Sequence, residues 1–227
     1  MSQTTTHIVF PIFHRVTHLD FTGPHQVFSY VPEAHITVAS LGGRDIDARG
    51  FVFGGLADLS EVEKCDVLCV PGGSGTTEAM LDAAFMTEIR RLATGARYLT
   101  SVCTGALILG AAGLLHGKRA TTHWATHDLL APLGATADEG RVVRDGNVIT
   151  GGGVTAGIDF AFVAVAEIFG RGVAESIELR MEYAPAPPFG VGRPDIAPAA
   201  LVASARDSLK STVDANRGAV EQIAQRL

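Results

Sequence analysis

Cys103 is a candidate nucleophile because of the residues on either side of it. The extended apolar segment 96–101 precedes it, and Thr104 and Gly105 lead into an apolar run typical of a helix. A side chain at such a strand-to-helix turn stands clear of the sheet, over the free N–H groups and positive dipole end of the first helical turn. We therefore predict a reactive thiol that is partly ionised near neutral pH. The alternative is a small apolar residue packed beneath the helix, which is common for unpaired cysteines.

Asp20 and the pair Gly72 and Gly73 follow two other predicted strands. In an open parallel sheet, ligands bind beyond the carboxyl ends of the strands, so these residues are expected to meet Cys103. A carboxylate beside a thiol could exchange a proton with it or with a substrate, and glycine N–H groups could approach a developing negative charge. The alternatives are that Asp20 caps a helix whose first turn holds Pro24, and that the glycines only form a turn.

His123 and His127 lie four residues apart, a spacing that some metal sites use. Trp124 follows the first histidine where a zincin motif has glutamate, and the sequence offers no third ligand, so we predict no metal site. His123 is a further candidate base or orienting residue for Cys103. The alternative is a histidine that is hydrogen-bonded at the start of a helix.

The elements that must position these residues alternate along the chain. Short apolar or β-branched runs at 7–13, 35–40, 65–71 and 96–101 are separated by stretches that resemble helices. This alternation predicts an α/β fold with a mostly parallel sheet. Several of the runs are apolar on both faces, which indicates an interior sheet covered by helices on both sides.

The second half of the sequence predicts four further elements. Asp-Gly within 141–150 indicates a β-hairpin. The apolar helix 155–169 is expected to be buried, and Asp159 within it is expected to find hydrogen-bond partners inside the core. Prolines make 184–198 an extended arm that wraps the surface or reaches a partner subunit. Apolar residues at near-helical spacing predict an amphipathic helix over 199–227.

Composition narrows the class of protein. A chain of 227 residues that is 47% hydrophobic can bury a large core, and we expect one domain spanning residues 1–227. The beginning of the chain lacks a basic signal region, and no apolar run reaches the roughly 18 residues of a membrane span. Three unpaired cysteines favour a reducing compartment, so we expect the cytoplasm. A formal charge of -6 without a basic cluster argues against binding to nucleic acid or anionic membranes.

Five motifs together resemble the ThiJ/PfpI superfamily over about residues 7–185. The motifs are DFTGPH at 20–25, VPGG at 70–73, SVCTGA at 101–106, ATTHW at 120–124 and GGGVTAGIDF at 151–160. The resemblance implies a flavodoxin-like three-layer sandwich with a nucleophile elbow at Cys103. Within the superfamily the chain is most similar to the isocyanide hydratase branch, which also carries aspartate where most relatives have glutamate. That similarity extends over the arm and the terminal helix, and it implies a homodimer.

The resemblance also implies roles for individual residues. Cys103 is the expected nucleophile, Asp20 the expected acid and base, and Thr104 the residue that tunes the thiol and supplies a backbone N–H group. The implied reaction is the hydration of an isocyanide to an N-substituted formamide through a thioimidate on Cys103, with water as the second substrate. We expect neither a metal nor an organic cofactor.

Two alternatives remain open from the sequence. The Cys-Thr-Gly and Thr-Thr-His-Trp motifs also occur in the ligand-sensing domains of AraC-type transcription regulators. The chain ends about 27 residues after Ala200, which is expected to be too short for the two helix-turn-helix units of such regulators. A glyoxalase-like or deglycating enzyme of the same superfamily is the other alternative, which a glutamate in place of Asp20 would have favoured.

Overall fold

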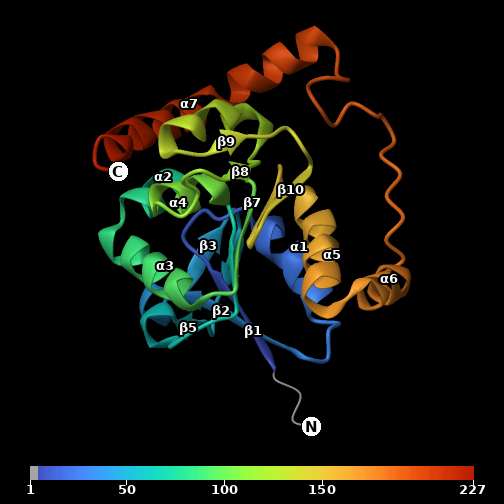
Figure 1. The fold of residues 1–227 in the computed structure, drawn as a ribbon. Helices are drawn as coiled ribbons and strands as arrows, with labels where there is room; N and C mark the ends of the chain where they lie inside the picture. The colour runs from blue at the N-terminus through green and yellow to red at the C-terminus, as the bar shows by residue number, and fades with distance from the viewer. Residues whose placement is uncertain (1–4) are drawn as a thin grey trace.

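The structure, a computed structural model that describes residues 5–227, is built around a seven-stranded sheet. The strand order is β10-β11-β7-β6-β1-β2-β5, and within the described residues every neighbouring pair is parallel except β10 with β11 (Figure 1). The strands of this sheet are β1 (Thr6–Pro11), β2 (Ala34–Ser40), β5 (Ala57–Asp58), β6 (Val67–Val70), β7 (Tyr98–Val102), β10 (Val142–Asp145) and β11 (Val148–Gly151).

Helices cover both faces of the sheet. In Figure 1, α1 and α5 lie on one side of the strands, and α2, α3 and α4 lie on the other. This arrangement confirms the predicted α/β sandwich with three layers. The helices are α1 (His18–Phe28), α2 (Thr76–Leu81), α3 (Ala83–Gly95), α4 (Gly105–Ala111), α5 (Ala156–Phe169), α6 (Arg171–Arg180) and α7 (Ala199–Ala224).

Smaller elements complete the chain and lie outside the main sheet. They are the strands β3 (Ile46–Ala48), β4 (Phe51–Phe53), β8 (Arg119–Ala120) and β9 (Thr136–Ala137), and the 3-10 helices η1 (Leu41–Gly43), η2 (Leu59–Glu61), η3 (Trp124–Leu129) and η4 (Ala131–Leu133).

The four runs that the sequence predicts as parallel strands form β1, β2, β6 and β7. Every residue of β6 is buried, as its apolar sequence on both faces requires. The predicted hairpin is also present, with Asp145 opposite Val148 across the turn. β11 pairs in parallel with β7, so only the outer strand β10 reverses direction in the described part of the sheet.

The prediction that the apolar helix at 155–169 is buried in the core instead of lying on the surface is wrong at Val163 of α5. Val163 keeps 40% of its surface exposed, because α5 belongs to an outer layer and packs against the sheet and its neighbours α1 and α6 on its other sides. Asp159 is satisfied as expected, but at a partly exposed position, where Arg141 Nε donates to its Oδ2 at 2.7 Å.

The helix that holds Asp20 begins earlier than the Gly-Pro pair suggested. α1 begins at His18, which places Asp20 in the first turn and Pro24 in the interior of the helix. Thr17 is the N-terminal cap and makes no side-chain capping bond, so the capping role considered for Asp20 is wrong. A Cβ atom at Gly157 of α5 would lie 3.3 Å from the Pro24 ring, which shows how closely α1 and α5 approach.

The C-terminal part of the chain crosses back over the sheet. The segment 184–198 contains no helix or strand, and Figure 1 shows it running outside the sandwich from α6 to α7. α7 then packs against α2, α4 and η3. On α7, Asn216 is buried and its Oδ1 accepts a hydrogen bond of 2.7 Å from Thr77 Oγ1. No helix in residues 5–227 is both long and apolar enough to cross a membrane.

Candidate active site

Cys103 occupies a strained turn between β7 and α4. Its φ of 56° lies in the left-handed region, which costs a residue with a side chain of order 1–3 kcal/mol. Hydrogen bonds hold the turn in place, because Cys103 N–H donates to the carbonyls of Gly151 and Gly152 at 3.0 and 2.9 Å. Its carbonyl accepts from Thr122 Oγ1 at 2.9 Å. The predicted elbow is therefore present, and its conformation is fixed by the loop after β11.

Two glycines allow the loop after β6 to approach the elbow. A Cβ atom on Gly105 would lie 2.1 Å from the Val70 carbonyl oxygen, and one on Gly72 would lie 2.5 Å from both the backbone nitrogen and Oγ1 of Thr104. Both distances are far below ordinary contact, so any larger residue would displace backbone. At the elbow, the backbone of the loop after β6 therefore packs directly against the backbone of residues 104 and 105.

Asp20 is buried beside the elbow. Its side chain has no exposed surface, and Oδ2 accepts a hydrogen bond of 3.1 Å from Gly72 N–H. Oδ1 is buried without a hydrogen-bond partner in the described residues. Burial raises the pKa of Asp20 to about 7, against the opposing effects of Gly72 N–H and the Cys103 side chain. This carboxyl group can therefore take up or release a proton near neutral pH.

The prediction that the Cys103 thiol is partly ionised near neutral pH is wrong for this geometry. Burial raises the pKa of Cys103 well above its usual range, and the nearby charge of Asp20 raises it further. The backbone N–H groups of Val154 and Thr104 act in the opposite direction, with smaller effects. The effects of burial and of a neighbouring carboxylate on the pKa of Cys103 outweigh that of the N-terminal end of α4, a helix of only seven residues. Cys103 and Asp20 thus lie close enough for each side chain to affect the pKa of the other.

Val154 is a site residue that the sequence analysis missed. Its N–H group contacts the Cys103 thiol, and its φ of 24° is outside the favoured regions for a β-branched residue. The run of glycines at 151–153 indicated a close backbone approach, but nothing in the sequence identified the following residue as the one that reaches the sulfur.

Thr104 connects the elbow to the loop after β6 and to α2. Its Oγ1 accepts from Gly73 N–H at 3.0 Å and lies 2.7 Å from Thr76 Oγ1. Gly72 N–H is already bonded to Asp20. The expectation that both glycine N–H groups face a developing charge beside Cys103 therefore disagrees with the structure, because each has a partner within the protein. Both glycines instead position the side chains of Asp20 and Thr104.

His123 takes the alternative role that the sequence left open. Its Nδ1 accepts a hydrogen bond of 3.3 Å from Ala125 N–H, so the histidine caps η3. Burial and the neighbouring His127 lower the pKa of His123. Its ring lies against Gly153, where a Cβ atom would come within 2.8 Å of Cδ2. Residues 5–227 contain no hydrogen bond from His123 to Cys103 and no group of three metal-ligating side chains.

A cavity of about 520 Å³ lies next to the elbow, although neither Cys103 nor Asp20 is among the residues that line it. Thr122, Gly152 and Val154 line it, and each of these residues contacts Cys103. The remaining walls come from the beginnings of η3, β10 and α5, from the arm and from α7. The side chains that line these walls include His123, Trp124, Arg141, Arg193, Asp195 and Arg206.

Comparisons with known proteins agree with this fold. The family model described as "DJ-1/PfpI family" matches residues 6–167. The chain is 46% identical over 224 residues to the isonitrile hydratase of Pseudomonas putida, which covers 97% of both proteins. It superimposes on the crystal structure of a ThiJ/PfpI family protein from Pseudomonas syringae with a TM-score of 0.92, at 36% identity over 95% of this chain and 90% of that one. It is also 30% identical to the HTH-type transcriptional regulator GlxA of Rhizobium meliloti, over 64% of this chain but 46% of the regulator.

Proposed function

Because the chain belongs to the DJ-1/PfpI family, we propose that it is an enzyme that hydrates isocyanides to N-substituted formamides. The observation that carries this proposal is the 46% identity to an isonitrile hydratase over 97% of both chains. Isonitrile is another word for isocyanide. The pair formed by Cys103 and Asp20 supports the proposal independently, because this chemistry needs a nucleophile and a mobile proton on one carbon.

The first half of the proposed reaction adds S–H across the terminal carbon of R–N≡C. Asp20 takes the thiol proton from Cys103, Sγ forms a bond to the isocyanide carbon, and Asp20 delivers the proton to that same carbon. The product is the thioimidate R–N=CH–S on Cys103. A carboxyl group whose pKa is about 7 suits this role, since it can accept and return a proton at neutral pH.

The second half consumes one water molecule. Water adds to the thioimidate carbon, and Asp20 transfers a water proton to the nitrogen. The C–S bond then breaks, Cys103 leaves as a thiolate and regains its proton, and R–NH–CHO is released. In this proposal the N–H groups of Val154 and Thr104 stabilise the departing thiolate, and their lowering effect on the pKa of Cys103 supports that role. Thr104 additionally ties the elbow to Gly73 and Thr76.

Formamide production from cyclohexyl isocyanide tests the proposal. We expect wild-type protein to turn over this compound, Cys103→Ala to lose turnover, and Asp20→Ala to lose at least about 100-fold in kcat. Cys65→Ala is the matched control, because Cys65 is a buried cysteine before β6, at the opposite end of the strands from Cys103, and it should retain turnover. Folded wild-type protein without turnover would contradict the proposal, and consumption of methylglyoxal instead would favour a glyoxalase-like enzyme.

A ligand-sensing domain is the second candidate, supported by the 30% identity to a transcriptional regulator. The higher sequence identity favours the hydratase, since this chain is 46% identical to the hydratase and 30% identical to the regulator. A sensor would bind isocyanides or other ligands without converting them, so the turnover assay also separates these two candidates.

We also propose that the protein is a cytoplasmic homodimer with one domain per chain. Free cysteines support a reducing compartment. Exposed apolar side chains support an interface with a second copy, including Phe51 at 58% and Val52 at 67% exposure on the β3–β4 hairpin, and Phe189 at 83% on the arm. Light scattering after size exclusion should give twice the chain mass, and a monomer would contradict the dimer.

A further inference from the structure

The cavity next to the elbow is larger than an isocyano group needs. Ligand pockets commonly measure about 300–1,000 Å³, and this cavity of about 520 Å³ has room for a sizeable substituent beyond the reacting carbon. Cys103 is buried and is not among the lining residues, but Val154 lines the cavity and its N–H group lies beside the Cys103 thiol. The cavity therefore adjoins the proposed reacting carbon, and the substituent of a substrate bound at Sγ would extend into it past Val154. The side chains that line the cavity walls then determine which substituents bind.

Three arginines line the cavity, and two of them are neutralised. Arg141 is paired with Asp159, and two of the three guanidinium nitrogens of Arg193, Nε and Nη2, donate to Asp195 at 3.0 and 2.7 Å. Arg206 differs, because it has no ion-pair partner in the described residues.

Arg206 is held by a ring instead of a carboxylate. Its guanidinium carbon lies 5.0 Å from the centre of the Trp124 ring, across the contact between α7 and η3. Stacking on the face of an indole orients the guanidinium plane and leaves its N–H edges free. A planar guanidinium with free edges matches the two oxygens of a carboxylate.

We propose that this cavity selects isocyanides that carry a carboxylate on their substituent, and that Arg206 binds that carboxylate. The proposal rests on the proposed hydratase function and specifies its substrate class. Glu139 also lines the cavity without an ion-pair partner in residues 5–227, and its charge opposes the anion. Glu139→Gln therefore strengthens carboxylate binding, whereas loss of Arg206 weakens it.

Isocyanoacetate and its ethyl ester are matched probes, because they differ in the carboxylate charge and are hydrated to N-formylglycine and its ethyl ester. For Arg206→Met we expect the KM for isocyanoacetate to rise about tenfold or more, as for loss of a charged hydrogen bond, with kcat retained. Activity on the ester should not change. Arg226→Met removes the same charge outside the cavity and should leave both substrates unaffected. An unchanged ratio of kcat/KM between the two substrates in Arg206→Met would overturn the proposal.

Binding of N-formylglycine separates failure of this inference from failure of the hydratase function. Calorimetry with wild-type protein should give binding that is at least about tenfold tighter than for the ethyl ester, and Arg206→Met should remove this difference. If neither isocyanide is turned over but this preference is found, the hydratase function fails and the carboxylate site stands. If the ester is turned over and the carboxylate has no advantage in rate or binding, the function stands and the inference fails.

Discussion

Two buried cysteines at opposite ends of the sheet show which surroundings favour chemistry. Cys65 precedes β6 at the amino end of the strands, and Cys103 follows β7 at their carboxyl end. Burial raises the pKa of both thiols, that of Cys65 to about 12. Neither burial nor a raised pKa therefore distinguishes a candidate nucleophile from a structural cysteine in this molecule.

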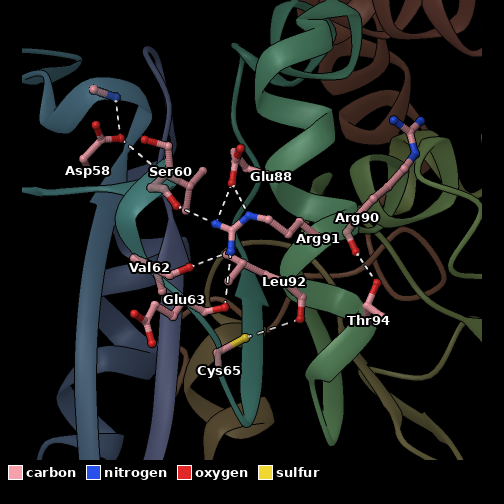
Figure 2. Close-up of polar contacts among 12 residues, drawn as sticks. Asp58, Ser60, Val62, Glu63, Cys65, Glu88, Arg90, Arg91, Leu92 and Thr94 are labelled. Carbon is pink, nitrogen blue, oxygen red and sulfur yellow. Dashed lines mark hydrogen bonds and ion pairs between the residues drawn. The ribbon is translucent and has the colours of Figure 1, made fainter.

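What differs is whether the polar groups nearby are satisfied. Around Cys65, Arg91 donates to the carbonyls of Leu59, Val62 and Glu63, and Cys65 Sγ itself faces the Leu92 carbonyl (Figure 2). Beside Cys103, one buried oxygen of Asp20 has no partner in the described residues, and the backbone of Cys103 and Val154 is strained. Strain and an unsatisfied buried group persist only where the surrounding structure holds them, and such places are often functional.

Gly105→Ala should break the elbow and produce the largest change in stability. The new Cβ would lie 2.1 Å from the Val70 carbonyl oxygen, so the backbone at the elbow must shift. We expect a loss of at least about 3 kcal/mol in the free energy of unfolding, together with loss of turnover, measured by urea denaturation and formamide assay. Gly172→Ala on α6 meets nothing within 4 Å and should gain about 0.5–1 kcal/mol. Equal effects at the two positions would contradict the packing argument.

Asp20→Asn should change how the stability of the protein depends on pH. The pKa of Asp20 is raised from 3.8 to about 7, so the folded protein binds more protons than the unfolded chain between these pH values. At low pH, Asp20 therefore contributes roughly 2–4 kcal/mol to the free energy of unfolding. This contribution is lost as pH rises through about 7. The stability of the wild type relative to D20N should therefore fall from pH 4 to pH 8, as denaturation at each pH will measure. A constant difference would show that Asp20 does not titrate in this range.

Arg91→Met should have the smallest of these effects, and it should lower the stability of the protein without lowering its activity. The variant leaves several carbonyls of the η2 segment without their donor, which we expect to cost about 1–3 kcal/mol in the free energy of unfolding. Because this cluster lies at the other end of the sheet, kcat and KM for an isocyanide should stay within about twofold of wild type. A large loss of kcat in the folded variant would show that the two ends of the sheet are coupled.

Much of the architecture could be predicted from local patterns. Runs that are apolar on both faces became parallel strands, and Asp-Gly in 141–150 became the turn between β10 and β11. The errors lie where distant segments meet. The neighbours of Asp20 resemble a helix start and suggest a capping role, but its carboxylate accepts a hydrogen bond from Gly72, which is 52 residues away. Val154 escapes sequence analysis for the same reason, because its N–H group lies beside the sulfur of Cys103, in a distant segment of the chain.

The sequence alone is enough to predict how strands and helices alternate along the chain, the elbow at Cys103 and the residue types available at the carboxyl end of the sheet. These follow from apolar periodicity and from glycines whose conformational freedom is encoded locally. The pKa values of Cys103 and Asp20 and the charge of the cavity depend on the tertiary structure. A pKa depends on burial and on neighbours from other segments, and the free guanidinium of Arg206 depends on how α7 packs on η3.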